Sequence, residues 1–458
     1  MEIRGTLLLA LSLMLLPSVT QAQGGMTPAD EQSLAAALGA EEQGRVHDAE
    51  LTLAGLVRKY PSNFQVLASL GEVYANEGEF RKAVPVLEKA CQLESSSAIP
   101  LANLGAVYLK LSRVEDAERT LKRAVALDPG NPDTQSNLGI VLMQRNHPRE
   151  AAAAFAAAAS SRPSDDDLLY NWGLALYNSS QNEKAVQVLQ RVSNAESSAA
   201  VQSLLGDICE SRKQYQQAVA HYQTAAKLVP SEPNLYVLGI EFMRHWTFDA
   251  AIQTFEYGAT RYPDSQRTLL ALGIAKYANS DYFGAAPILA RALDADPDNE
   301  LIANTLGHDC SLLPDDKPGC SKLIGFAGHH PANAPVAVYA AASILHRPAG
   351  QQDLEQAGQL LKQAISADPK FPESYYQQGL LDQQEGNWHA SIPPLEQAIV
   401  LKPEYAQAHY RLMLAYSHTN QHQQAKAELA LWQKYDQQGK DDVNARFRQV
   451  TIFLVAQR

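Results

Sequence analysis

The chain has 458 residues, of which 46% are hydrophobic and 19% charged, a composition typical of an ordered globular protein. Its formal net charge of -12 at pH 7 argues against a nucleic-acid partner, which requires a basic surface, and against docking on an anionic membrane. The charge is spread along the chain and therefore favours solubility without marking an acidic site.

The first expected element is a signal peptide over residues 1–22. A short charged start includes Arg4, an apolar run covers Leu7 to Leu16, and Pro17 breaks the run before small residues that end at Ala22. The apolar stretch of about 15 residues is shorter than the ~20 residues of a membrane-spanning helix. No cysteine follows the run, so a bacterial lipid anchor is not indicated. We expect cleavage and a periplasmic or secreted mature chain without a membrane span; an uncleaved N-terminal anchor is the alternative.

After a linker expected at residues 23–33, a sequence period runs through residues 34–300. Glycines recur every 34 or 33 residues, and a small residue, usually alanine, follows twelve positions after each glycine. Proline follows most of the glycines after twenty-four positions. Such a period is typical of helix–turn–helix units, in which we expect the glycine of one helix to face the alanine of the next, while proline ends the unit. The glycines are Gly71, Gly105, Gly139, Gly173, Gly206, Gly239, Gly273 and Gly307, and Gly379 rejoins the series.

This period resembles the tetratricopeptide repeat, whose signature of 34 residues places Gly, Tyr, Ala and Pro at these offsets. Gly105, Tyr108, Ala117 and Pro129 follow that signature, and the resemblance extends over roughly residues 30 to 435. It implies an all-α fold, namely an α-solenoid that forms a right-handed superhelix of about twelve helical hairpins. The expected signal peptide makes this an exported protein of bacterial type.

Residues 301–350 depart from the pattern. Gly319 stands where other units have alanine, and a proline-rich turn at 313–318 precedes it. The step from Pro331 to Pro369 is 38 residues, which indicates an insertion and a local kink or protruding turn. Regular units are expected again over 351–435. Residues 436–458 carry apolar residues at helical spacing and predict a capping helix over the last exposed hydrophobic face.

The sequence contains no motif that indicates a reaction. There is no phosphate-binding loop, no GxSxG elbow and no HExxH helix, so we expect neither an enzyme nor a cofactor. One cluster has a metal-like composition and could hold zinc, although its spacing matches no metal hairpin: His308, Cys310, Cys320, His329 and His330. A disulfide between Cys310 and Cys320 is the interpretation that we favour in an oxidising compartment. Cys91 and Cys209 are expected to be buried thiols.

The candidate binding residues come from the resemblance, which implies that first helices line a concave groove and that the residue two positions before each glycine points into it. Asn103, Asn137 and Asn171 hold that position in three successive units. A carboxamide has donors and an acceptor, so a row of them can pair with the backbone of an extended peptide. The row is similar to the asparagine ladder of the protein O-linked N-acetylglucosamine transferases; a structural role in bonding the neighbouring hairpin is the alternative. The aromatic and methionine residues expected on the same face are Tyr170, Tyr177, Tyr236, Met243 and Tyr277.

These observations predict a non-enzymatic scaffold of the cell envelope or secreted space that binds protein or peptide partners. One alternative is a carbohydrate-binding or polysaccharide-export accessory module, for which we would expect exposed tryptophan platforms. Another alternative is a non-catalytic relative of a tetratricopeptide-containing glycosyltransferase. Nucleic acid is not an expected partner, and nothing in the sequence indicates an oligomeric state.

Overall fold

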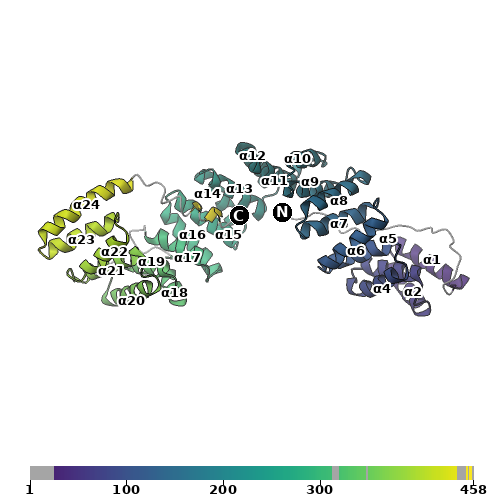
Figure 1. The fold of residues 1–458 in the computed structure, drawn as a ribbon, viewed down its shortest axis with the longest axis horizontal. Helices are drawn as coiled ribbons and strands as arrows, with labels where there is room; N and C mark the ends of the chain where they lie inside the picture. Colours follow the sequence, from purple (N-terminus) through teal and green to yellow (C-terminus); the bar gives the residue numbers. More distant parts are fainter. Residues whose placement is uncertain (1–24, 312–318, 347–348, 441–449, 452, 456–458) are drawn as a thin grey trace. The chain divides into compact units, whose positions relative to one another are not determined.

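The computed structural model describes residues 25–311, 319–346, 349–440, 450–451 and 453–455 (Figure 1). These residues form 24 α-helices and one 3-10 helix and contain no strand, which confirms the all-α prediction. Consecutive helices pack as hairpins, and the 24 helices make twelve pairs. The expected signal peptide and the proline-rich turn at 313–318 lie outside the described residues.

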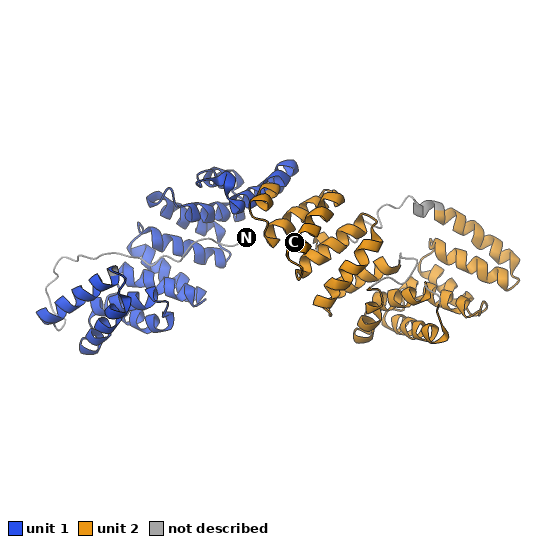
Figure 2. Cartoon of the chain, turned by 180° about the vertical axis from the view of Figure 1, so that it is seen from behind, with its two compact units in different colours: residues 1–221 blue, residues 222–458 orange. Residues whose placement is uncertain are grey.

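The chain divides into two compact units, residues 1–221 and 222–458 (Figure 2). The division falls inside one helix, α12, since the hairpins of a solenoid pack continuously one against the next. The helices from the N-terminus through α12 are α1 (Pro28–Glu42), α2 (Val46–Lys59), α3 (Phe64–Asn76), α4 (Phe80–Leu93), α5 (Ala98–Lys110), α6 (Val114–Leu127), α7 (Pro132–Gln144), α8 (Pro148–Ser161), α9 (Asp166–Asn178), α10 (Asn182–Leu189), η1 (Ala195–Ser197), α11 (Ala199–Ser211) and α12 (Tyr215–Leu228). The second unit continues with α13 (Glu232–Arg244), α14 (Phe248–Arg261), α15 (Gln266–Ala278), α16 (Tyr282–Ala295), α17 (Glu300–Ser311), α18 (Lys322–His329), α19 (Ala334–Leu345), α20 (Gln351–Ala367), α21 (Pro372–Gln384), α22 (Ile392–Leu401), α23 (Ala406–His418) and α24 (His422–Lys440).

The periodic glycines face a large side chain, and the expectation that they face alanine was wrong. A Cβ atom on Gly139 would lie 2.6 Å from the ring of Phe155, and one on Gly105 would lie 2.5 Å from Leu121. The large residue sits sixteen positions after the glycine, one helical turn beyond the alanine, and fills the space above the glycine backbone. The same pairing joins Gly71 to Leu87, Gly173 to Leu189, Gly239 to Phe255, Gly273 to Leu289 and Gly379 to Leu395.

The alanines that follow the periodic glycines by twelve positions are buried. Ala117 and Ala151 have no exposed surface, and Ser391 replaces alanine without exposure. A larger side chain at these positions would overlap the neighbouring helix, which explains why the register holds small residues.

The turn within most hairpins contains one residue in the left-handed region. Gly78 has a φ of 77°, and Ser112 and Asn146 both have a φ of 59°. These positions recur with the period of the glycines, but their residue type varies, so the sequence pattern did not reveal them. The other hairpin-turn residues with a positive φ are Gly44, Ser180, Lys213, Trp246, Ser280, Gly386 and Asn420.

The first helix begins earlier than expected. α1 starts at Pro28, so residues 28–33 of the predicted linker are helical. Thr27 caps the helix by accepting a hydrogen bond from the Asp30 amide, and proline suits the first helical position because no amide is needed there. The Asp30 carboxylate also accepts a hydrogen bond from the Tyr60 hydroxyl at 2.6 Å, which ties α1 to the end of α2.

The irregular unit is built around different contacts. A Cβ atom on Gly307 would lie 2.5 Å from Tyr339 of α19, so the next hairpin supplies the large side chain that α18, only eight residues long, does not. Gly319 has a φ of 108° and lies against Ala290 of α16, which requires glycine at this position.

The end of the chain differs from the expected cap. α24 continues to Lys440, past the expected boundary at 435, and residues 441–449 lie outside the described part. Val450 and Phe453 belong to the buried cluster that runs from Tyr236 to Leu381, and not to the cluster of α22–α24. Figure 1 accordingly places this short yellow segment among α13–α16, apart from α24. None of the described helices has the length and apolar character needed to span a bilayer.

We expect Gly139→Leu to lower the free energy of unfolding by about 1–3 kcal/mol, because the added side chain overlaps Phe155. Urea unfolding followed by circular dichroism measures the change. Gly55→Leu is the matched control: Gly55 lies on an exposed face of α2 with no atom near its missing Cβ, so this variant should be at least as stable as the parent. Equal stability of Gly139→Leu and the parent would contradict the packing described here.

Candidate functional site: a peptide-binding face of the first unit

Three asparagines occupy one register on successive first helices of the first unit. Asn103, Asn137 and Asn171 lie on α5, α7 and α9, 34 residues apart, and expose 1%, 2% and 3% of their surface. We call these residues the asparagine row. Buried carboxamides persist in proteins only where their donors and acceptors are satisfied, and each of these three side chains has an interaction within the protein.

An apolar residue follows each asparagine after three positions. These residues are Ala106, Ile140 and Leu174, and all three are buried. Residues three apart on a helix share one face, so each asparagine has an apolar neighbour one turn further along. Each of these three helices therefore carries a carboxamide and an apolar side chain on successive turns of one face, and both are buried.

The predicted aromatic residues divide between the two units. Tyr170 precedes Asn171 on α9 and is buried, and Tyr177 is half-buried on the same helix. Tyr277 lies in the second unit on α15, where its hydroxyl lies 2.9 Å from Nδ1 of His308 on α17. The first unit thus brings Tyr170 and Tyr177 onto the helix of Asn171, whereas Tyr277 takes part in a buried contact between two first helices.

An acid near the start of the face was not recognised from the sequence. Glu72 on α3 directly follows Gly71 and so holds the register position of Ala106, Ile140 and Leu174. Burial, with a smaller contribution from the charge of Glu41, raises the pKa of Glu72 to about 7. The carboxyl is therefore poised to lose its proton near neutrality and would favour a basic group on a bound segment.

A second polar register has a structural role. The Gln135 amide donates to the Pro129 carbonyl at 2.9 Å, and the Gln202 amide donates to the Ala195 carbonyl at 3.1 Å. In the second unit the Tyr375 hydroxyl donates to the Pro369 carbonyl at 3.1 Å. These side chains lie four positions before the glycine register and bind the turn that precedes their own helix, so they hold neighbouring hairpins together.

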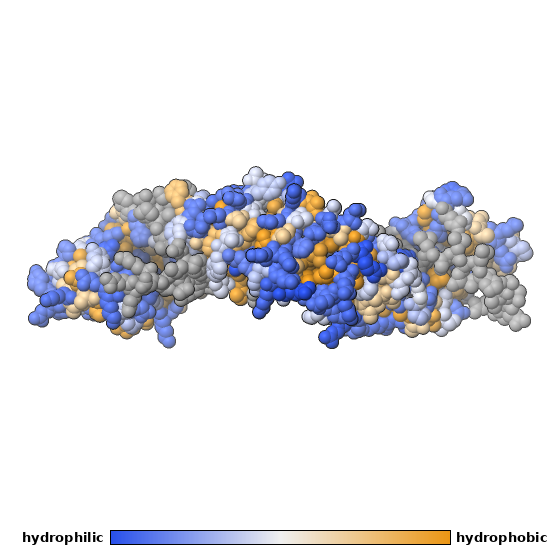
Figure 3. Space-filling view, turned by 90° about the horizontal axis from the view of Figure 1, so that it is seen from above, coloured by the Kyte–Doolittle hydropathy of each residue, from blue (hydrophilic) through white to orange (hydrophobic). Residues whose placement is uncertain are grey.

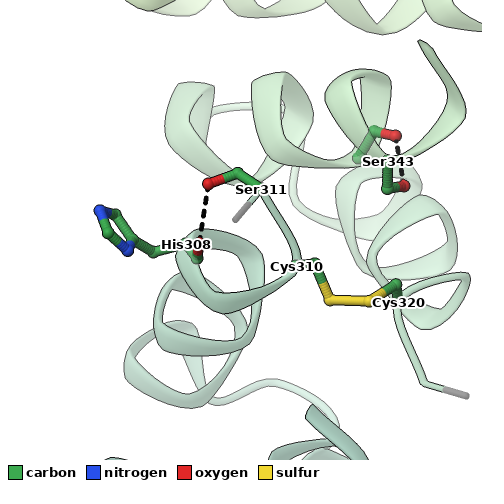
Figure 4. The surroundings of a disulfide bond; sticks show 6 residues. His308, Cys310, Ser311, Cys320 and Ser343 are labelled. Atoms are coloured by element: carbon green, nitrogen blue, oxygen red, sulfur yellow. Dashed lines mark hydrogen bonds between the residues drawn. A yellow bond between two sulfur atoms is a disulfide. The ribbon is translucent and has the colours of Figure 1, made fainter. Parts of the chain in front are cut away.

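Cys310 and Cys320 form a disulfide with a Cα–Cα distance of 5.8 Å (Figure 4). It joins the end of α17 to the residues before α18, while the His308 ring points away from the sulfur atoms. Bonded sulfur atoms are no longer thiolate ligands, and the described residues include no group of three metal-ligating side chains. Cys91 and Cys209 are free and buried, as predicted.

Next to this disulfide lies a buried acid that the sequence analysis also missed. Asp309 has no exposed surface, and neither carboxyl oxygen has a hydrogen-bond partner within the described ranges. Burial, with the charge of Asp281, raises its pKa to about 8. The group is therefore mostly protonated at neutral pH.

The face drawn in Figure 3 shows hydrophobic patches separated by hydrophilic residues. Large apolar side chains that are exposed, such as Leu51, Tyr257 and Val400, are scattered over several hairpins. Scattered residues of this kind are normal on a protein surface and do not indicate a broad apolar interface.

Two family models match the chain. Residues 15–235 match the model described as the cilia and flagella-associated protein 70 C-terminal domain, and residues 236–300 match a tetratricopeptide repeat model. The chain is a tetratricopeptide repeat protein. No curated protein matches it by sequence.

Several solved structures resemble this tetratricopeptide repeat protein at low identity. Naa15/Naa10 bound to HypK-THB has 14% identity and a TM-score of 0.37, covering 88% of this chain and 68% of that one. PilF of Pseudomonas aeruginosa has 22% identity and a TM-score of 0.37, covering 45% of this chain and 94% of its own. YrrB, described as a TPR protein with an unusual peptide-binding site, has 18% identity and a TM-score of 0.38, covering 40% of this chain and 94% of that one.

The burial of Asp309 predicts how the stability of the folded chain depends on pH. The pKa of Asp309 in the folded state lies above its unfolded value of 3.8. With respect to this group, the folded state is therefore most stable below about pH 4 and loses stability as the pH rises towards 8. Asp309→Asn removes the titration and should be about 1–3 kcal/mol more stable than the parent at pH 8, with the difference vanishing below about pH 4. Urea unfolding at several pH values measures this. Asp264→Asn, in an exposed turn, is the control and should leave the pH profile unchanged; an unchanged profile for Asp309→Asn would contradict the assignment.

Proposed function

We propose that this protein is a non-enzymatic scaffold that binds extended segments of partner proteins along the asparagine row. The observation that carries the proposal is the repetition of one carboxamide at one register of α5, α7 and α9, each with an apolar residue one turn further on. Carboxamides pair with the main chain of a peptide whatever its sequence, and the apolar positions select its side chains.

The surroundings of the row also indicate which segments fit. Ala106 is small, whereas Ile140 and Leu174 are larger, so an apolar segment is accommodated better than a charged one. The titrating carboxyl of Glu72 adds a preference for a basic group at the end nearest α3. An apolar peptide with a basic residue at one end is therefore the class of ligand that we propose.

We further propose that the protein is exported and acts in the periplasm or outside the cell. The charged start, the short apolar run and the small residues before residue 22 support this proposal. The Cys310–Cys320 disulfide supports it as well, because disulfides persist mainly in oxidising compartments.

Replacing the asparagine row should weaken peptide binding without unfolding the chain. Peptides selected from a displayed library against the full chain should bind Asn103→Ala/Asn137→Ala/Asn171→Ala roughly 100-fold more weakly, because three hydrogen bonds of about 1 kcal/mol each are lost. Fluorescence anisotropy measures the affinity.

Asn234→Ala provides the control for this experiment. Its carboxamide lies on α13 and donates to the Val229 carbonyl at 2.8 Å, so its loss removes a structural contact outside the row. Peptide affinity should be unchanged in this variant. If the triple variant and the parent bind the peptides with equal affinity and have matching circular dichroism, the proposed binding role of the row is wrong.

Export is tested on the protein isolated from its native host. The mass of the chain from the envelope or the medium should correspond to loss of residues 1–22, and alkylation after unfolding should modify Cys91 and Cys209 but not Cys310 or Cys320. Recovery of the whole chain from the cytoplasm with all four thiols free would refute the proposal.

A further inference from the structure

In the hairpin of α23 and α24, a buried histidine lies between two hydrogen-bond acceptors (Figure 1). His409 on α23 is 2% exposed. Its Nδ1 lies 2.5 Å from Oε2 of Glu428 on α24, and its Nε2 lies 2.9 Å from the carbonyl oxygen of Pro403, in the turn before α23. A neutral imidazole has one N–H group and can donate to only one of these acceptors. Both contacts are therefore hydrogen bonds only when His409 and Glu428 together hold a second proton, which the imidazolium form provides.

The same two positions of the repeat hold a different pair in the first unit, and that pair needs no second proton. Gln202 on α11 and His221 on α12 are 19 residues apart, as are His409 and Glu428. The Gln202 amide donates to the Ala195 carbonyl at 3.1 Å, and its Oε1 lies 2.8 Å from Nδ1 of His221. A neutral imidazole supplies that bond, and burial lowers the pKa of His221. The need for a second proton thus comes from the residues on α23 and α24 and not from the packing that the hairpins share.

Few charged groups act on the His409 ring. Glu428 faces it from α24, and the ring of Tyr435 on the same helix stacks on it with centroids 5.4 Å apart. Glu404, in the turn before α23, is exposed. Other charged side chains on the neighbouring elements have other partners: Glu373 on α21 accepts from the Tyr405 hydroxyl, Glu396 on α22 accepts from the Tyr416 hydroxyl, Lys402 lies over the Tyr405 ring and Lys434 lies over the Tyr435 ring.

The two acceptors favour the charged ring. Burial alone would lower the pKa of His409, but the Glu428 carboxylate and then the Pro403 carbonyl outweigh burial and raise the pKa above its ordinary value of 6.5. A group with a higher pKa in the folded chain stabilises the fold fully below about pH 6.5, and this contribution is lost as the pH rises through the folded-state pKa. Once the second proton has left, a ring nitrogen and an acceptor oxygen face each other in a buried place with no hydrogen between them, which is unfavourable.

We propose that the hairpin of α23 and α24 is a proton-dependent closure, in which doubly protonated His409 holds α24 on α23 and loss of one proton at higher pH loosens α24. α24 contributes Ala425 to a buried cluster that includes Leu412 and Ala415 of α23, so its loosening exposes part of that apolar cluster. The closure is independent of the asparagine row, because it lies in the second unit and uses none of those residues.

Hydrogen exchange of the full chain, followed by mass spectrometry between about pH 5.5 and 8.5 and corrected for the intrinsic exchange rate, tests the closure. The opening constant of α24, relative to that of α22, should rise about 10-fold or more in the parent, because a charge-assisted hydrogen bond is lost. Glu428→Gln should remove this rise, since a carboxamide can accept from an imidazolium or donate to a neutral ring. Glu396→Gln is the matched control: this acid accepts from the Tyr416 hydroxyl at 2.7 Å, so its replacement should leave the pH profile of the parent unchanged.

Two outcomes would overturn the proposal. One is an opening constant of α24 in the folded parent that does not change with pH, and the other is a pH profile of Glu428→Gln that equals that of the parent. If Glu428→Gln does not fold, His409→Gln/Glu428→His replaces it and installs the pairing of Gln202 with His221. This double variant should also lack the rise towards pH 8.5, and a rise as large as that of the parent would contradict the closure.

Discussion

On seven of the first helices, the contact between a glycine and a leucine or phenylalanine of the second helix sets the separation of the two helices. Because the glycine has no Cβ, the large side chain lies directly over the backbone of α3, α5, α7 or α9, and the two helices approach to that distance. The fully buried alanine one turn earlier tolerates the same closeness. Once that distance is fixed, each first helix turns one face to its partner and leaves the opposite face for the next hairpin or for a ligand.

Much of the fold could be predicted from the period of the glycines and alanines, because each unit repeats one local packing solution. The number of hairpins, the buried alanines and the buried thiols followed from it. The residue opposite each glycine could not be predicted, since both the alanine and the leucine or phenylalanine recur with the same period. The start of α1 was missed because the capping role of Thr27 depends on a local backbone conformation and not on the period.

The site was less predictable than the fold. The sequence places Asn103, Asn137 and Asn171 in one row, but burial decides which acids titrate near neutrality, and neither Glu72 nor Asp309 carries a sequence signal of that burial. The placement of Phe453 depends on a long-range contact that periodicity does not encode. The register of the asparagine row holds carboxamides on α5, α7 and α9 but Val237 on α13 and Ala271 on α15, so its chemistry changes along the array.

The pairing of Gly307 with Tyr339 has a consequence for how the chain can change its length over evolution. In the regular part, gain or loss of one whole period keeps every glycine with its own large partner, so such events are tolerated. Across α17–α19 the partner comes from the following hairpin, and a duplication that ends between Gly307 and Tyr339 separates them. We therefore expect recombination to keep the helices α17–α19 together as one piece.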